Sequence, residues 1–137
     1  MRCLLCLLSA FFLTQPPALA MPPVIVIKWD THAYEVELAD TAAARELVKQ
    51  LPLTLHASDL NANEKYGDLP AALPTAPRAV GRVHAGDLML YTPTCLVLFY
   101  KDFSTPYRYT PVGRLKAPRE LQQALGAGEV LLRLEAP

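Results

Sequence analysis

Short hydrophobic runs separated by turn-forming residues recur along the chain, a pattern typical of β-strands. The clearest pair covers residues 86–91 and 95–100, and the break between them, Thr92-Pro93-Thr94, predicts a tight hairpin turn. The second run is apolar at every position, which is typical of a strand that is covered on both faces. We therefore expect this hairpin at the middle of a sheet or barrel.

The rest of the pattern predicts further strands and two short helices. Glu35 and Glu37 alternate with apolar residues directly after a β-branched run, so these two runs predict a first hairpin. Asp40-Thr41 is typical of a helix N-cap, and Pro118 of a first helical position. These strands are expected at residues 24–29, 33–38, 53–56, 80–83, 112–115 and 129–135, and the helices at 42–50 and 119–125. All these elements together predict a mainly β protein, a small closed eight-stranded β-barrel with two short helices.

Two segments show no regular pattern. Residues 59–77 are rich in turn formers and contain three closely spaced prolines, and residues 101–111 form a second loop that carries aromatic side chains. Long irregular connections inside a compact domain usually carry function. We expect the two segments to converge on one cleft.

Residues 1–20 begin with one basic residue, continue with an apolar run and end in the small-residue site Ala18-Leu19-Ala20. This order predicts a secretory signal peptide that is cleaved after residue 20. Residues 21–137 would then form one domain in the periplasm or outside the cell, with no stable membrane insertion after cleavage. The alternative is that Met21 starts the protein, which would then be cytoplasmic.

The charge balance argues against one class of partner, and the cysteine count argues against disulfide stabilisation. The chain has 13 Lys and Arg residues against 13 Asp and Glu residues, without a basic cluster, so we do not expect nucleic acid as a partner. Cleavage would leave Cys95 as the one remaining cysteine, so packing must stabilise the domain without an internal disulfide.

No complete catalytic or metal-binding motif appears in the sequence. His32, His56 and His84 lie in separate elements, and no pair has metal-ligand spacing. Cys95 has no neighbouring group that would lower its pKa, so we interpret it as a small buried hydrophobic residue. We therefore predict no metal and no cofactor.

Several pieces of the chain, in this order, resemble one known family. They are residues 51–54 with 59–66, residues 85–91, and residues 98–101 with 109–113. Together they resemble the bacterial cyclophilin-like domain family over nearly all of residues 21–137. The resemblance implies a cyclophilin-type eight-stranded barrel, and because the family has no settled activity it implies no reaction.

True cyclophilins are prolyl isomerases, with a catalytic arginine shortly after a strand phenylalanine and a Gly-Gly-Asp-Phe segment nearby. In this chain Phe99 is followed by Tyr100-Lys101, and Gly86-Asp87 is followed by leucine. The resemblance therefore implies that the main source of isomerase catalysis is absent. The alternative is an isomerase with a rearranged active face that uses another arginine, such as Arg82 or Arg108.

We predict a non-catalytic module that binds a small molecule or a short peptide. The polar residues of the first irregular segment and the aromatic residues near the second would form the site, because amphipathic rings bury area at little entropic cost. The competing interpretations are that the asparagines satisfy their own turn, that Glu64 is solvated and that the aromatic residues pack in the barrel. An interaction surface for a partner protein is a third possibility. The candidate ligand-binding residues are Asn61, Asn63, Glu64, Tyr66, Tyr91, Tyr100, Phe103, Tyr107 and Tyr109.

Overall fold

A computed structural model describes residue 14 and residues 23–137, so the predicted signal peptide lies almost entirely outside the described residues. The strands are β1 (Val24–Trp29), β2 (His32–Leu38), β3 (Leu53–Leu60), β4 (Glu64–Asp68), β5 (Arg78–Ala79), β6 (Arg82–Val83), β7 (Asp87–Leu90), β8 (Cys95–Phe99), β9 (Phe103–Ser104), β10 (Arg108–Leu115) and β11 (Val130–Glu135). The helices are α1 (Ala42–Gln50) and α2 (Leu121–Leu125).

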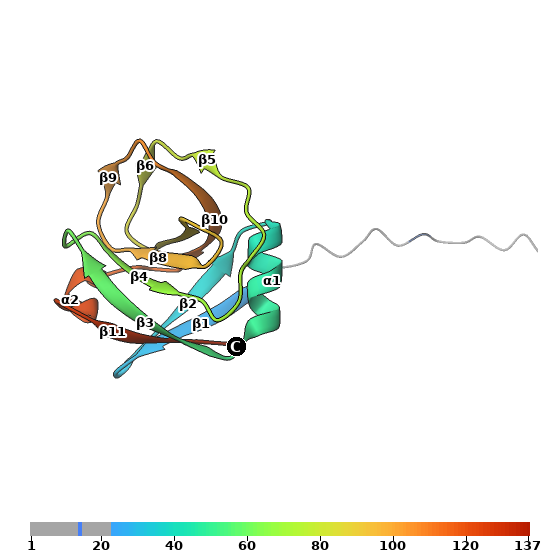
Figure 1. The fold of residues 1–137 in the computed structure, drawn as a ribbon. Helices are drawn as coiled ribbons and strands as arrows, with labels where there is room; N and C mark the ends of the chain where they lie inside the picture. The colour runs from blue at the N-terminus through green and yellow to red at the C-terminus, as the bar shows by residue number, and fades with distance from the viewer. Residues whose placement is uncertain (1–13, 15–22) are drawn as a thin grey trace, which may run out of the picture.

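The long strands close into a barrel. They follow the order β2-β1-β11-β3-β4-β8-β7-β10, and β10 pairs back onto β2, with every neighbouring pair antiparallel. Strand β5 adds to β10, and β6 pairs with β9 beside the barrel (Figure 1). The predicted closed eight-stranded barrel with two short helices is confirmed.

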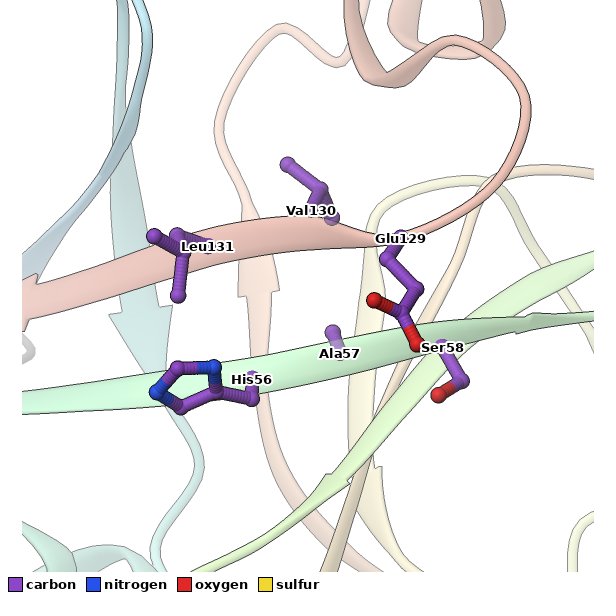
Figure 2. A pocket seen from close by; sticks show the side chains of 6 residues that line it. All are labelled: His56, Ala57, Ser58, Glu129, Val130 and Leu131. Atoms are coloured by element: carbon purple, nitrogen blue, oxygen red, sulfur yellow. The ribbon is translucent and has the colours of Figure 1, made fainter.

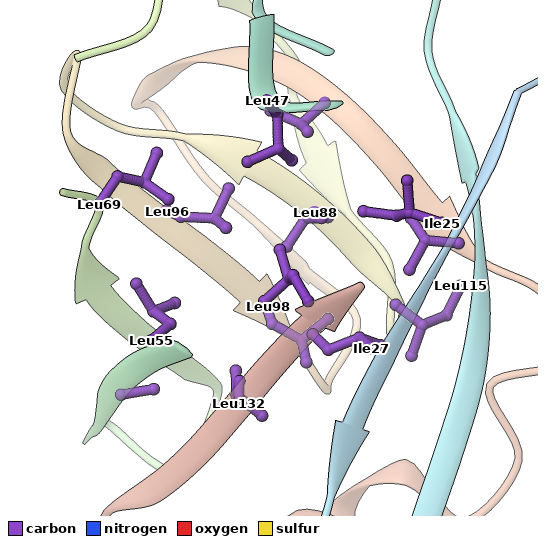
Figure 3. Close-up of a cluster of buried hydrophobic side chains, with 14 of the residues drawn as sticks. Ile25, Ile27, Leu47, Leu55, Leu69, Leu88, Leu96, Leu98, Leu115 and Leu132 are labelled. Carbon is purple, nitrogen blue, oxygen red and sulfur yellow. The ribbon is translucent and has the colours of Figure 1, made fainter. Parts of the chain in front are cut away.

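Aliphatic side chains fill the barrel interior. Figure 3 shows leucine and isoleucine side chains from strands on different sides of the barrel meeting Leu47 of α1. Helix α2 adds Leu121 and Leu125 to the same cluster. Thr41 caps α1 by accepting a hydrogen bond from the Ala44 N–H at 3.2 Å, and the helix ends before Pro52, as the sequence predicts.

Strand β8 is covered on both faces, as its continuous apolar run predicts. Leu96 and Leu98 point into the barrel, whereas Val97 and Phe99 join a second cluster on the outer wall. This outer cluster also contains Val83, Met89 and Tyr109, with Val80 and Phe103 packed against it. The short segments around β5, β6 and β9 therefore cover the outside of the barrel at its central hairpin (Figure 1).

The prediction that residues 59–77 are irregular throughout was wrong. Strand β3 continues to Leu60, and residues 64–68 form β4, which lies between β3 and β8. The strand alternates inward and outward residues as any barrel strand does, but its inward positions are Lys65 and Gly67. Because neither is a typical core residue, the pattern of hydrophobic positions conceals the strand.

Other boundaries also differ from the prediction. The second irregular segment is shorter than expected, since β10 begins at Arg108. Of the strand expected at 80–83, only Arg82–Val83 forms a strand, β6, and the short strand β5 precedes it. Gly81 separates the two, with a φ of 73° that is favourable for glycine. Helix α2 begins only at Leu121 because Glu120 has left-handed backbone geometry with φ 54°.

Gly67 allows β4 to lie close to β3. A Cβ atom at this position would be 2.5 Å from the His56 carbonyl oxygen and 2.9 Å from Leu55 Cγ. We predict that Gly67→Ala destabilises the fold by about 2–3 kcal/mol, because overpacking against backbone cannot be relieved by a side-chain rotation. Urea unfolding measures this change.

The matched control is Asp68→Ala in the same strand, where the side chain is exposed. This variant should change stability by less than about 0.5 kcal/mol. Equal stability of the two alanine variants would contradict the assigned close contact at Gly67.

Candidate functional site

A pocket of about 280 Å³ lies on the outer wall of the barrel. Its residues come from the end of β3, from β4, from the β7–β8 turn, from β8, from the segment before β10 and from β10 itself. We call it the tyrosine pocket, and it is lined by Leu60, Glu64, Tyr66, Tyr91, Cys95, Val97, Tyr107 and Tyr109.

Tyrosine rings form most of its walls. The Tyr91 ring lies edge-on to Tyr107, with centroids 6.0 Å apart, and 5.8 Å from the ring of Tyr109. Tyr109 is buried and packs against Phe99, whereas 58% of Tyr107, 51% of Tyr91 and 36% of Tyr66 are exposed. Three exposed rings around one hollow are unusual for a surface without a binding role.

Glu64 supplies the one charged side chain that lines this pocket. It faces outward from β4 opposite Phe99 of β8 and is half-buried. Burial raises the pKa of the Glu64 carboxyl, and the negative charge of Asp59 raises it further. Among the described residues, no group donates a hydrogen bond to this carboxylate.

Cys95 lines the same pocket as a poor nucleophile. Burial raises the pKa of its thiol, and the charges of Asp68 and Glu64 add to the effect. The thiolate is therefore disfavoured.

The opposite face of β4 carries a buried ammonium group. Lys65 is fully buried, and its Nζ donates to Asp59 Oδ1 at 3.0 Å and to the carbonyl oxygens of Gly126 and Gly128 at 2.9 and 2.6 Å. The Tyr100 hydroxyl donates to the same Asp59 oxygen at 2.6 Å. This hydrogen bond is the main cause that lowers the pKa of Asp59, while burial raises the pKa of Tyr100.

The cyclophilin-like family model matches residues 27–135. The chain belongs to the cyclophilin-like family. Among solved structures, the solution structure of a hypothetical protein from Archaeoglobus fulgidus is similar, with a TM-score of 0.58 and 17% sequence identity over 88% of this chain and 99% of that chain. This likeness supports the fold, and no curated protein matches the sequence.

The cyclophilin-like fold brings five of the predicted site residues together. Glu64 and Tyr66 meet Tyr91, Tyr107 and Tyr109 at the tyrosine pocket. The expected convergence of the two segments is therefore present in these residues.

The other four predicted residues do not line the tyrosine pocket. Asn61 and Asn63 lie in the β3–β4 turn, where Asp59 accepts a hydrogen bond from the Ala62 N–H at 3.1 Å and so caps the turn. Tyr100 points away from the pocket to Asp59, and Phe103 packs on Phe99.

The sequence analysis missed three lining residues. Cys95 and Val97 lie on the pocket side of β8, and Leu60 ends β3 opposite Glu64. A period-two reading of β8, with Leu96 and Leu98 inward, would have indicated the outward pair.

A second hollow lies between β3 and β11 of this cyclophilin-like barrel. Figure 2 shows its residues, with the Glu129 side chain extending toward Ser58 and with His56 beside Leu131. It has a volume of about 250 Å³ and contains no aromatic ring except the imidazole. It therefore lacks the anchoring side chains that the tyrosine pocket has.

The arginines that could replace the missing catalytic arginine lie away from the tyrosine pocket. Arg82 and Arg108 do not line it, and the Arg108 side chain donates to the Pro77 carbonyl at 3.0 Å.

Within the described part of the chain, no group of three or more His, Cys, Asp or Glu residues is placed to hold a metal ion. No helix among these residues has the length and apolar character needed to cross a membrane.

The Tyr100–Asp59 hydrogen bond yields a pH-dependent prediction. Tyr100→Phe should cost about 1–2 kcal/mol at pH 7, because it removes a hydrogen bond to a charged group. Since the folded-state pKa of Asp59 is lowered from 3.8, the stabilisation is present above that value and is lost as the pH falls through the folded-state pKa. Urea unfolding at pH 7 and pH 2.5 should therefore show a cost that shrinks in acid.

Tyr91→Phe is the matched control, because the Tyr91 side chain is half exposed. Its cost should stay below about 0.5 kcal/mol at both pH values. A Tyr100→Phe cost that is the same at both pH values would contradict the role of the Asp59 charge.

Proposed function

We propose that this cyclophilin-like domain is a non-catalytic binding module that holds a small molecule or a short peptide in the tyrosine pocket. The observation that carries the proposal is the meeting of exposed tyrosine rings and one half-buried carboxylate at a single hollow. An apolar hollow with few polar groups is the usual composition of a ligand site.

The scaffold supports this proposal because it fixes the pocket before any ligand arrives. Tyr66, Val97 and Tyr109 belong to paired barrel strands, and Tyr91 flanks the tight β7–β8 turn. The Tyr91 N–H donates to the Cys95 carbonyl at 3.0 Å, which holds that turn closed. Binding would therefore require little ordering of the backbone, and this lowers its entropic cost.

The barrel interior offers no comparable space. Ile27, Leu98 and Leu132 are buried inside a continuous cluster, as Figure 3 shows for the side chains around them. A ligand would therefore bind on the outer wall, where the second apolar cluster supports the pocket from below.

The chemistry of the lining residues supports binding without catalysis. None of the eight is a histidine, serine, lysine or arginine, and the pKa of the Cys95 thiol is raised. Export of the domain stays a prediction from the pattern of residues 1–20.

A thermal-shift screen of metabolites and short peptides tests the proposal. Ligands that raise the melting temperature of the unaltered protein should lose most of that effect in Tyr66→Ala and Tyr107→Ala, because each change removes an exposed ring from the pocket wall. We expect affinity losses of roughly tenfold, corresponding to about 1–2 kcal/mol for each ring.

Tyr34→Ala is the matched control, since Tyr34 stacks on Trp29 in the first hairpin and does not line the pocket. It should leave the ligand-induced shift unchanged. Ligands that still stabilise both pocket variants as strongly as the unaltered protein would place binding elsewhere.

A further inference from the structure

We propose that the tyrosine pocket selects an organic cation, with an ammonium group bound between the Glu64 carboxylate and the tyrosine rings. This inference rests on the proposed function, because it names the chemical class of ligand for the same pocket. Three features of the described residues carry it: a carboxylate without a hydrogen-bond donor, a pocket lining without lysine or arginine, and rings that can face a cation.

The carboxylate of Glu64 lacks a partner of its own. The adjacent Lys65 points to the opposite face of β4, where Asp59 and the carbonyl oxygens of Gly126 and Gly128 bind its ammonium group. Neighbours in a strand point to opposite faces, so this lysine cannot serve Glu64 without leaving its own site. No lysine or arginine of the described residues lines the pocket, so a cationic ligand could pair with Glu64 without displacing a group of the chain.

The surroundings of Glu64 destabilise its negative charge, and a bound cation would stabilise it. Burial in the apolar pocket disfavours the charged carboxylate and raises its pKa, and Asp59 adds a like charge from β3. A bound cation would offset both effects and so lower the pKa of Glu64 again, which means that cation binding should weaken where Glu64 is protonated.

The titratable groups that line the pocket with Glu64 are Tyr66, Tyr91, Cys95, Tyr107 and Tyr109, and Asp59 acts on it from β3. Lys65 and Tyr100 instead bind Asp59. Arg108, which lies between Tyr107 and Tyr109, donates to the Pro77 carbonyl and does not line the pocket.

The rings add a second, independent attraction. A cation within about 6 Å of a tyrosine centroid is attracted by the negative face of the ring, and the effect is greatest where water is excluded. Tyr91 and Tyr107 lie edge to face, 6.0 Å apart, so their faces point in different directions around the hollow. With a volume of about 280 Å³, the pocket suits a compact ammonium group or the charged end of a longer ligand.

Choline and 3,3-dimethylbutan-1-ol form a matched pair of probes, because they share a shape and differ in charge. Nitrogen-15 NMR titrations of the full chain give both affinities, and shifts at Glu64, Tyr91 and Tyr107 locate the binding. We expect choline to bind at least about tenfold more tightly than the alcohol. Lowering the pH through the raised pKa of Glu64 should weaken choline binding and leave the alcohol unchanged.

Glu64→Gln should abolish the preference for choline while keeping the affinity for the alcohol within about twofold. This variant should fold, since burial already favours the neutral side chain. Glu46→Gln, on the exposed face of α1, makes the same change in net charge at a distance and should keep the preference.

Equal binding of the two probes, or a choline preference that survives in Glu64→Gln, would overturn the inference. A metabolite that binds at the tyrosines while choline does not would also overturn it, yet would leave the proposed function standing. A screen without any tyrosine-dependent ligand would instead remove the proposed function itself. A lysine-containing tripeptide that binds more tightly than both choline and its norleucine counterpart would support the inference with a peptide as the source of the ammonium.

Discussion

The buried ammonium group of Lys65 fixes the arrangement on which the rest of the structure depends. It joins β4 to the Asp59 carboxylate of β3 and to the chain between α2 and β11. Because an unpaired buried charge costs several kcal/mol, β4 can adopt only the register that keeps this group paired. A shift by one residue would bury Glu64 and Tyr66 in the barrel and expose the lysine. The same interaction therefore closes the barrel near α2 and turns two pocket residues outward.

Local sequence patterns were sufficient to predict the elements in which the spacing of apolar residues agrees with the turn and capping residues at the ends. The first hairpin, helix α1 and the central hairpin have apolar positions at strand or helix spacing, bounded by ordinary turns and caps. The continuous run of β8 even indicated that both of its faces are covered. Strand β4 was concealed because its inward residues are a paired lysine and a glycine in close contact with backbone. Both residues are explained by contacts with β3 and with the α2–β11 segment, which no local pattern contains.

The sequence predicted the types of residue that form the candidate site, but not fully which residues line it. Tyr66 and Tyr109 face the pocket because they lie in strand segments whose residues alternate between the two faces, and the sequence analysis had interpreted both segments as parts of loops. Tyr100 looks equally suited in the sequence, yet it follows Phe99 by one residue and so points to the other side, to Asp59. Assigning each ring to the correct side requires the pairing of β4, β8, β7 and β10, which long-range contacts determine.

The division between a filled barrel and a pocket on its outer wall has a consequence for how such domains diversify. The aliphatic residues that give the fold its cohesion are inside, and most rings that would meet a ligand are exposed on the other side of the wall. Replacing Tyr66, Tyr91 or Tyr107 should therefore disturb the interior little. Selection can change what the surface recognises at small thermodynamic risk, so relatives with the same barrel can acquire unrelated specificities by a few substitutions on one wall.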